Sequence, residues 1–376
     1  MILNTLIFFL ITFTSFVSFI GYGKLTNHLL FNTNQNQKNQ FNFFFLGLIV
    51  IIPVSYIYNI SINNNYYFNY LFFLIGIFFY FFIPGSKDYR SLFLLTLIFF
   101  LGLLISKTHE DFTSYHFQHL REISENYLIF GLANLDERYF YSSIFSYVQV
   151  LFKFHKFDLD LIHIPVYLIY LSLIGYLWSE IQKENKSFLL SIVFFLIIVK
   201  FRRISEFGYD YIGQFILIYV FFEYLFKSEI SKEKNTKLAL IYFTTLLIKI
   251  SNLYFLPIIM TFLLFQKTFL KLFDYKKIII VVIPFFFVFS FNSYLKTGCI
   301  NYILKDTCIS SKIIDWKFDY KKIENSKKII KNWSKGLYHQ KKIKLTEEEY
   351  NKNFNWVKNW FDVYALNKIG KFLLIC

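Results

Sequence analysis

The sequence predicts an all-α integral membrane protein with about ten transmembrane helices, and three observations lead to this prediction. Hydrophobic residues make up 56% of the 376 positions, with 52 Phe and 29 Tyr. Charged residues make up 17%, against about 25% in soluble domains. The apolar residues are also gathered into long runs that polar segments separate. A single soluble core cannot bury so many large side chains, whereas lipid can surround them.

Ten apolar runs are candidates for helices that cross a bilayer core of about 30 Å. They cover residues 2–20, 41–60, 68–84, 91–106, 160–178, 187–200, 213–226, 238–250, 252–265 and 278–292. The first run lacks a positive n-region and a small-residue cleavage site, so it is predicted to be a membrane helix and not a removed signal peptide. The shorter runs after 187 are equally consistent with re-entrant or buried segments.

Lys and Arg in the short loops predict which side of the membrane each loop faces. If the long loop 107–159 lies outside the cytoplasm, the short outer segments carry three positive residues, Lys200, Arg202 and Arg203. The inner loops then carry fourteen: Lys24, Lys38, Lys87, Arg90, Lys183, Lys186, Lys227, Lys232, Lys234, Lys237, Lys267, Lys271, Lys276 and Lys277. The positive-inside rule therefore favours this orientation.

Three regions follow from these assignments. Residues 1–292 are predicted to form the transmembrane bundle, including the outer loop 107–159. Residues 293–366 are polar and form an extracytoplasmic segment near the C-terminus. Residues 367–376 read as the start of a further, truncated span.

The outer loop 107–159 contains the first candidate site. Asp111, Tyr115 and His116 follow a predicted span directly, among further acidic and His residues that include His109 and Glu110. The functional interpretation is an active site at the outer membrane surface, with Asp111 as its carboxylate. The alternative is that charged residues simply prefer a solvated loop. Apolar residues then recur at helical spacing over 117–128 and 141–152, which predicts two interfacial helices.

His109, Glu110, Asp111 and His116 are also potential metal ligands. Adjacent residues on an unknown backbone are poor evidence for tetrahedral or octahedral geometry. We therefore predict no cofactor, with a divalent metal at these residues as the alternative.

A second outward-facing cluster contains Arg202, Arg203 and Asp210, and Lys249 lies near another outer helix end. Guanidinium groups at headgroup depth match the charge and planar geometry of a lipid phosphate. The alternative is ordinary interfacial anchoring. Glu223 lies in an apolar run near its inner end, where a short reach to water is expected to solvate it.

Cys299 and Cys308 both fall on the predicted outer side, nine residues apart. An oxidising compartment and a short loop favour a disulfide between them. The alternative is two unpaired thiols.

The order of these features resembles the GT-C glycosyltransferase architecture of multi-pass bacterial membrane proteins. The resemblance rests on Asp111 with Tyr115-His116, on Gly131-Leu-Ala-Asn-Leu with Arg138, on Gly208-Tyr-Asp210, and on Thr297-Gly-Cys299 with Thr307-Cys308 and Trp316. These strings are more narrowly similar to an uncharacterised multi-pass branch of such proteins. The resemblance implies the bacterial inner (plasma) membrane and a sugar on a polyprenyl-phosphate carrier as the donor.

On this resemblance, Asp111 would accept the proton of an acceptor hydroxyl, with Tyr115, His116 and Asp210 completing the catalytic site. Arg138, Arg202, Arg203 and Lys249 would bind the lipid phosphate and stabilise its negative charge as it leaves. Membrane lipid and the lipid-linked donor are the expected partners.

Two other function classes are consistent with the sequence: a transporter or flippase, and a structural membrane protein without catalysis. A transporter or flippase for a lipid-linked or small anionic solute is the main alternative, although no internal repeat is visible. Nucleic acid is not an expected partner despite the net charge of +15, because the Lys residues lie between apolar runs and form no solvated basic face with aromatic residues.

Overall fold

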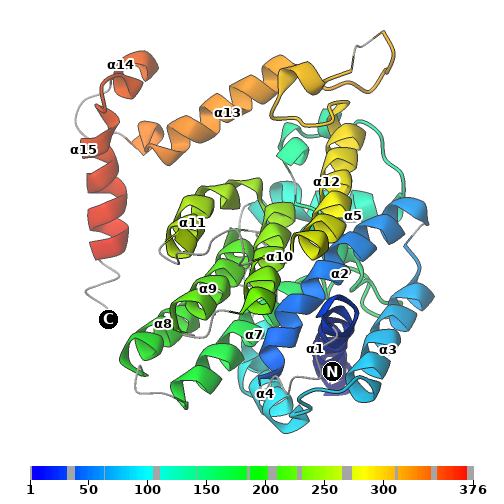
Figure 1. The fold of residues 1–376 in the computed structure, drawn as a ribbon. Coiled ribbons are helices and arrows are strands. Elements are labelled where there is room, and N and C mark those ends of the chain that lie inside the picture. Colours follow the sequence, from blue (N-terminus) through cyan, green and yellow to red (C-terminus); the bar gives the residue numbers. More distant parts are fainter. Residues whose placement is uncertain are drawn as a thin grey trace. The chain divides into compact units, whose positions relative to one another are not determined.

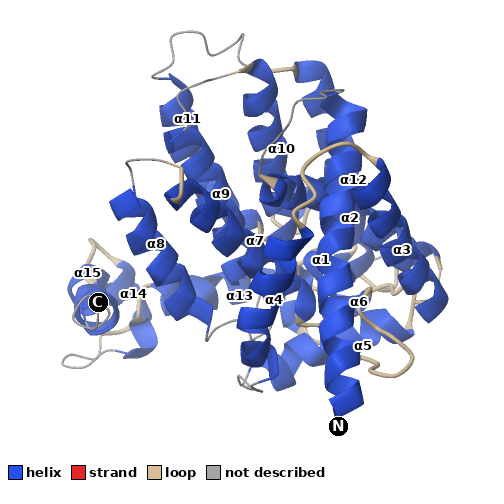
Figure 2. Ribbon diagram, turned by 90° about the horizontal axis from the view of Figure 1, so that it is seen from below, coloured by secondary structure: helices blue, strands red, loops and turns tan. Residues whose placement is uncertain are grey.

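The computed structural model describes residues 2–31, 39–62, 64–104, 111–141, 143–183, 187–201, 210–226, 231–264, 273–309, 312–339 and 345–370. Every regular element in these ranges is a helix (Figure 2), and the β-type pairing within them consists of the isolated bridges Phe154–Asp158 and Cys299–Cys308. The prediction of an all-α protein is confirmed for this part of the chain.

The chain divides into two compact units, and each is described by itself. The first contains Met1–Phe130 and Tyr141–Leu295, and the second contains Gly131–Phe140 and Lys296–Cys376. Figures 1 and 2 together label the helices, whose bounds are α1 (Ile2–Phe31), α2 (Gln40–Ser61), α3 (Tyr66–Phe82), α4 (Tyr89–Leu104), α5 (Phe117–Glu125), α6 (Phe145–Val150), α7 (Ile164–Ile181), α8 (Ser187–Lys200), α9 (Asp210–Phe226), α10 (Lys232–Ile248), α11 (Leu256–Leu264), α12 (Tyr275–Thr297), α13 (Tyr320–Ser334), α14 (Glu347–Asn351) and α15 (Trp356–Trp360).

Four described helices are long and apolar enough to cross a membrane: α1, α2 from Phe41, α7 and α12. Five shorter apolar segments fall in α3, in α4, in α8 from Phe188, in α9 from Tyr211, and at Ile250–Thr261 around the start of α11. This composition fits a membrane protein, while the number of ten crossings stays a prediction. Helix α10, which contains residues 238–248 of the predicted run 238–250, belongs to neither group, because its first turns are charged and polar.

Glycines allow α1 to pack closely against both α2 and α3 (Figure 1). A Cβ added to Gly21 in α1 would lie 1.8 Å from the carbonyl oxygen of Gly76 in α3. One added to Gly23 would lie 1.6 Å from the carbonyl oxygen of Phe43 in α2. Small residues at helix contacts are typical of membrane bundles, where close backbone approach replaces a hydrophobic driving force.

The outer faces of α3 and α4 are strongly apolar. Exposed side chains on α3 include Leu71, Leu74, Phe78 and Phe82, and those on α4 include Leu94, Leu97, Ile98 and Leu101. Contiguous apolar surface of this kind is rare on soluble monomers and normal where lipid covers it.

The prediction of a second interfacial helix over residues 141–152 is wrong. Helix α6 covers six residues, all of which are buried. It packs against α2, α5 and α7 and therefore belongs to the interior of the first unit. Apolar residues at helical spacing occur on interfacial helices and on buried ones alike, so the pattern did not distinguish the two.

The second unit includes part of the predicted outer loop. Asn134 donates a hydrogen bond from Nδ2 to the Trp316 carbonyl oxygen at 2.8 Å. The Phe140 ring lies 5.3 Å from that of Tyr302 and 6.3 Å from that of Phe318, centroid to centroid. Residues 131–140 thus pack with the polar segment that follows α12.

Candidate functional site

Asp111 is an exposed residue that immediately precedes a π-helical turn, Phe112–His116. This turn continues into α5, and the Phe117 N–H donates to the Phe112 carbonyl oxygen. Single π-helical turns occur preferentially at functional sites. His109 and Glu110 lie outside the described residues.

Tyr115 and His116 lie side by side in that turn. Their ring centroids are 4.1 Å apart, and the His116 side chain is buried, with 7% of its surface exposed. The following helix holds the segment in place, because Leu120 and Ile123 on its apolar face are fully buried. The site therefore combines an exposed carboxylate with an aromatic and imidazole pair on one short helical segment.

Arg138 belongs to the second unit, where it pairs with Asp136. Its Nη2 lies 3.0 Å from Asp136 Oδ2, and its Nε donates to Oδ1 at 3.2 Å. Burial acts to raise the pKa of Asp136, but the hydrogen bonds and the positive charge of Arg138 outweigh it, so the pKa is lowered. The guanidinium predicted to bind a lipid phosphate thus already has a carboxylate partner.

The structure describes the remaining predicted catalytic and phosphate-binding residues in part. Lys249 is half-buried and caps the C-terminus of α10. Asp210 is the first residue of α9. Arg202 and Arg203 lie outside the described residues. Among the predicted catalytic and phosphate-binding residues, the structure shows a ring contact between the neighbouring Tyr115 and His116.

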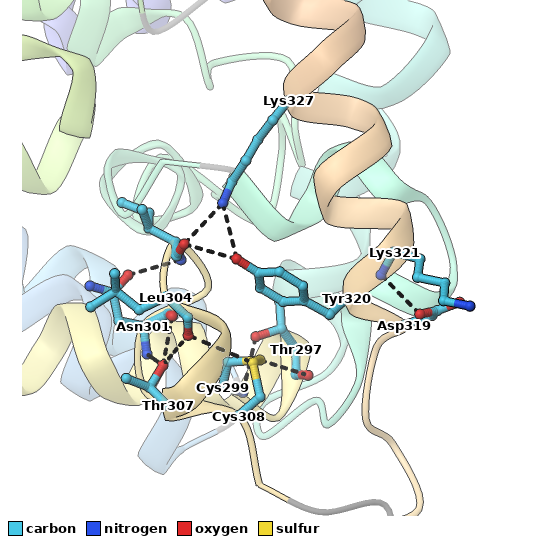
Figure 3. Close-up of a disulfide and its surroundings, with 11 residues drawn as sticks. Thr297, Cys299, Asn301, Leu304, Thr307, Cys308, Asp319, Tyr320, Lys321 and Lys327 are labelled. Carbon is cyan, nitrogen blue, oxygen red and sulfur yellow. Dashed lines mark hydrogen bonds between the residues drawn. A yellow bond between two sulfur atoms is a disulfide. The ribbon is translucent and has the colours of Figure 1, made fainter.

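A disulfide joins Cys299 and Cys308, whose Cα atoms are 3.8 Å apart. The two residues also form an isolated antiparallel bridge. The Ile300 N–H donates to the Thr307 carbonyl oxygen at 3.1 Å, which closes the loop between them. Figure 3 shows this loop with Thr307, Thr297 at the end of α12, and the start of α13.

A buried polar cluster in the first unit escaped the sequence analysis. Glu223 in α9 is only 4% exposed, and the Tyr176 hydroxyl of α7 hydrogen-bonds its carboxylate. Tyr219 donates from its hydroxyl to Asn42 Oδ1 at 3.3 Å, and its ring lies 4.9 Å from that of Tyr176. The prediction that water solvates the Glu223 carboxylate is therefore wrong. A carboxylate inside an apolar run was the available signal.

Metal binding has no support from side-chain geometry in the described ranges. No group of three or more His, Cys, Asp or Glu side chains there is arranged to hold a metal ion.

Comparison with known proteins identifies the family of the chain. No curated protein and no solved structure matches the sequence. The family described as a domain of unknown function (DUF8201) matches it over residues 1–376. Because this match covers the whole chain, the protein belongs to the DUF8201 family.

Proposed function

We propose that the protein is a membrane glycosyltransferase that transfers a sugar from a polyprenyl-phosphate carrier to an extracytoplasmic acceptor. The observation that supports this proposal is Asp111, an exposed carboxylate next to the Tyr115–His116 pair, on the helical segment that follows the apolar helix α4. A carboxylate in this place is expected at headgroup depth, where the anomeric carbon of a lipid-carried sugar lies.

The proposed step requires a base on the acceptor side and a stabilised leaving group. The acceptor hydroxyl oxygen forms a bond to the anomeric carbon as the bond from that carbon to the phosphate oxygen breaks. The hydroxyl proton passes to the Asp111 carboxylate and then to water, while the lipid phosphate leaves with the bonding electron pair. Arg202, Arg203 and Lys249 are the proposed cations for that phosphate, and Asp210 is a further proposed catalytic residue. Arg138 is a weaker candidate, because Asp136 offsets its charge.

The proposal includes ten crossings of the bacterial inner membrane. The exposed apolar faces of α3 and α4 support it, since they need lipid to cover them. Helices of 16 and 17 residues are about 24–26 Å long, which brings them close to the thickness of the hydrocarbon core.

The test is the rate of sugar transfer from a radiolabelled polyprenyl-phosphate sugar in membranes that contain the Asp111→Asn variant. This change keeps the side-chain size and removes the charge, so we expect a loss of about 100-fold or more, typical of a general base. Glu110→Gln removes a neighbouring charge and should have a much smaller effect. Full activity of Asp111→Asn, together with loss of activity in Asp210→Asn, would assign the base to Asp210 instead.

Transport of a lipid-linked or anionic solute is the second candidate, and the buried Glu223 favours it. Ionisable side chains inside a bundle often lie on transport pathways. Glu223→Gln should then abolish uptake or flipping of a labelled lipid-linked sugar in proteoliposomes, while Asp111→Asn leaves it intact. The enzyme proposal instead expects Asp111→Asn, and not Glu223→Gln, to abolish sugar transfer.

A further inference from the structure

The second unit contains a pocket of about 400 Å³ between the disulfide loop and the start of α13. Its lining brings together three lysines, two carboxylates and two aromatic rings: Lys305, Lys317, Lys321, Asp319, Glu324, Phe318 and Tyr320. All of these residues belong to the second unit, so the pocket is complete within it.

The walls of the pocket are held by covalent and hydrogen bonds. Lys305 lies on the loop that the Cys299–Cys308 disulfide closes. The Tyr320 hydroxyl in the first turn of α13 donates to the Ile303 carbonyl oxygen at 3.0 Å, which ties the helix to that loop (Figure 3). The same carbonyl accepts from Lys327 Nζ at 3.0 Å. The two walls therefore keep their spacing without a ligand.

The lysines in this region fall into two groups. Lys327 is engaged by Ile303 and by the Tyr320 hydroxyl, and Lys322 lies over the Phe318 ring at 5.7 Å. The lining lysines Lys305, Lys317 and Lys321 make no ion pair or side-chain hydrogen bond with any residue that the structure describes.

The carboxylates of the pocket offset only part of the charge of these three lysines. Asp319 caps α13, and its Oδ1 accepts from the Lys321 backbone N–H at 2.9 Å. Glu324 has no ion pair among the described residues. The pocket lining therefore has three ammonium groups against two carboxylates, a net charge of +1, and this balance favours an anionic ligand.

We propose that this pocket binds a phosphate group carried by a hydroxyl-bearing ligand. Ammonium groups form charge-assisted hydrogen bonds with phosphate oxygens. Asp319 and Glu324 can accept hydrogen bonds from hydroxyl groups on the rest of the ligand, and Tyr320 provides an aromatic surface beside them. The site involves neither Asp111 nor the helical bundle, so it does not depend on the proposed glycosyl transfer.

Binding is tested with the full chain in detergent, by calorimetric titration with inorganic pyrophosphate and with glycerol 1-phosphate. The triple variant Lys305→Gln, Lys317→Gln, Lys321→Gln should bind at least about tenfold more weakly, which corresponds to the loss of one or more charge-assisted contacts. The matched control replaces Lys322, Lys352 and Lys358 by Gln, removing the same charge from the same unit. It should bind within about twofold of the wild type, because these lysines lie outside the pocket.

Two outcomes overturn the proposal: absence of binding to the wild type, and equal weakening by the two triple variants, which indicates unspecific charge attraction. If the triple variant does not fold, lysine acetylation of the wild-type chain gives the answer. Pyrophosphate should then protect Lys305, Lys317 and Lys321 but not Lys322, Lys352 and Lys358, and uniform labelling contradicts the site.

The source of the phosphate is distinguished by competition. Nanodiscs that contain phosphatidylglycerol should displace pyrophosphate more than phosphatidylcholine discs if the site takes a lipid headgroup. Equal displacement by both identifies a soluble phosphate ligand.

Discussion

At the scale of single residues, the buried lysine of α1 is the most unusual side chain in the first unit. Lys24 is 0% exposed, and its Nζ donates to the Tyr80 carbonyl oxygen at 3.0 Å and lies 4.3 Å from the centroid of the Tyr80 ring. A weaker contact at 3.5 Å reaches the Gly85 carbonyl oxygen. Lys24 therefore holds the end of α3 and the following turn against α1.

Replacement of Lys24 by Met should destabilise this unit by about 1–3 kcal/mol, because the buried Tyr80 carbonyl loses its donor while the volume is kept. Unfolding in an SDS titration measures the change. Lys87→Met is the matched control, since Lys87 donates to the Phe81 carbonyl at 2.6 Å on the exposed surface, where water replaces the donor. Equal losses in the two variants would mean that burial of Lys24 contributes nothing.

The Asp136–Arg138 pair makes the second unit sensitive to acid. The pKa of Asp136 is lower in the folded chain than in the unfolded one. The pair therefore stabilises the fold above the unfolded pKa of about 4, and this contribution is lost as the pH falls through the folded value. We expect Asp136→Asn to lower the melting temperature at pH 7 and to flatten its decline below pH 4. Asp306→Asn, an exposed control, should leave the profile unchanged.

At the scale of helices, close packing at glycine decides how α1 meets α3. A Cβ on Gly21 would lie 1.8 Å from the Gly76 carbonyl oxygen, which is backbone and cannot move aside cheaply. Gly21→Ala should therefore destabilise the bundle by about 1–3 kcal/mol, as overpacking does elsewhere. Thermal unfolding in detergent tests this, with Gly370→Ala as the control, where the nearest atom is 3.8 Å away. A neutral Gly21→Ala variant would contradict the close approach of these helices.

The disulfide has a separate consequence for the second unit. Closing a loop of this length should contribute about 2–3 kcal/mol through the entropy of the unfolded chain. We expect Cys299→Ser with Cys308→Ser to lower the melting temperature to the value that reductant gives the wild type. Alkylation before and after reduction provides the direct measurement, and full labelling of both thiols without reductant would rule the bond out.

These elements show which features the sequence could predict. Long apolar runs located α1, α2, α7 and α12, because hydropathy alone identifies helices of that length. The burial of α6 was not predictable, since the same spacing of apolar residues occurs on a membrane surface. Likewise, the contact of Asn134 with Trp316 joins residues 182 positions apart, and no local pattern encodes it. At the candidate site, the sequence located Asp111 beside Tyr115 and His116, but the ion pair of Arg138 depends on a backbone turn that spacing does not define.

At the scale of the whole molecule, a topology with four membrane-spanning helices and one with ten differ in the side of the membrane on which they place two loops. If α1, α2, α7 and α12 alone cross, Lys87 lies outside with the rest of the segment between α2 and α7, and Glu206 lies inside. If ten helices cross, α3 and α4 return Lys87 to the cytoplasm, and α8 and α9 place Glu206 outside. Ten crossings are expected, because the outer faces of α3 and α4 need lipid and fourteen of the seventeen positive residues of the short segments then lie on the inner side.

Alkaline phosphatase fusions measure this directly, because the enzyme is active only outside the cytoplasm. Fusions after Lys87 and Lys234 should be inactive, and fusions near residues 130, 206 and 340 should be active. The fusions after Lys234 and near 340 are internal controls, since both topologies give them the same side. An active fusion after Lys87 with an inactive one near 206 would leave four crossings. An inactive fusion near 130 has the larger consequence: it would place Asp111 in the cytoplasm and contradict glycosyl transfer to an extracytoplasmic acceptor.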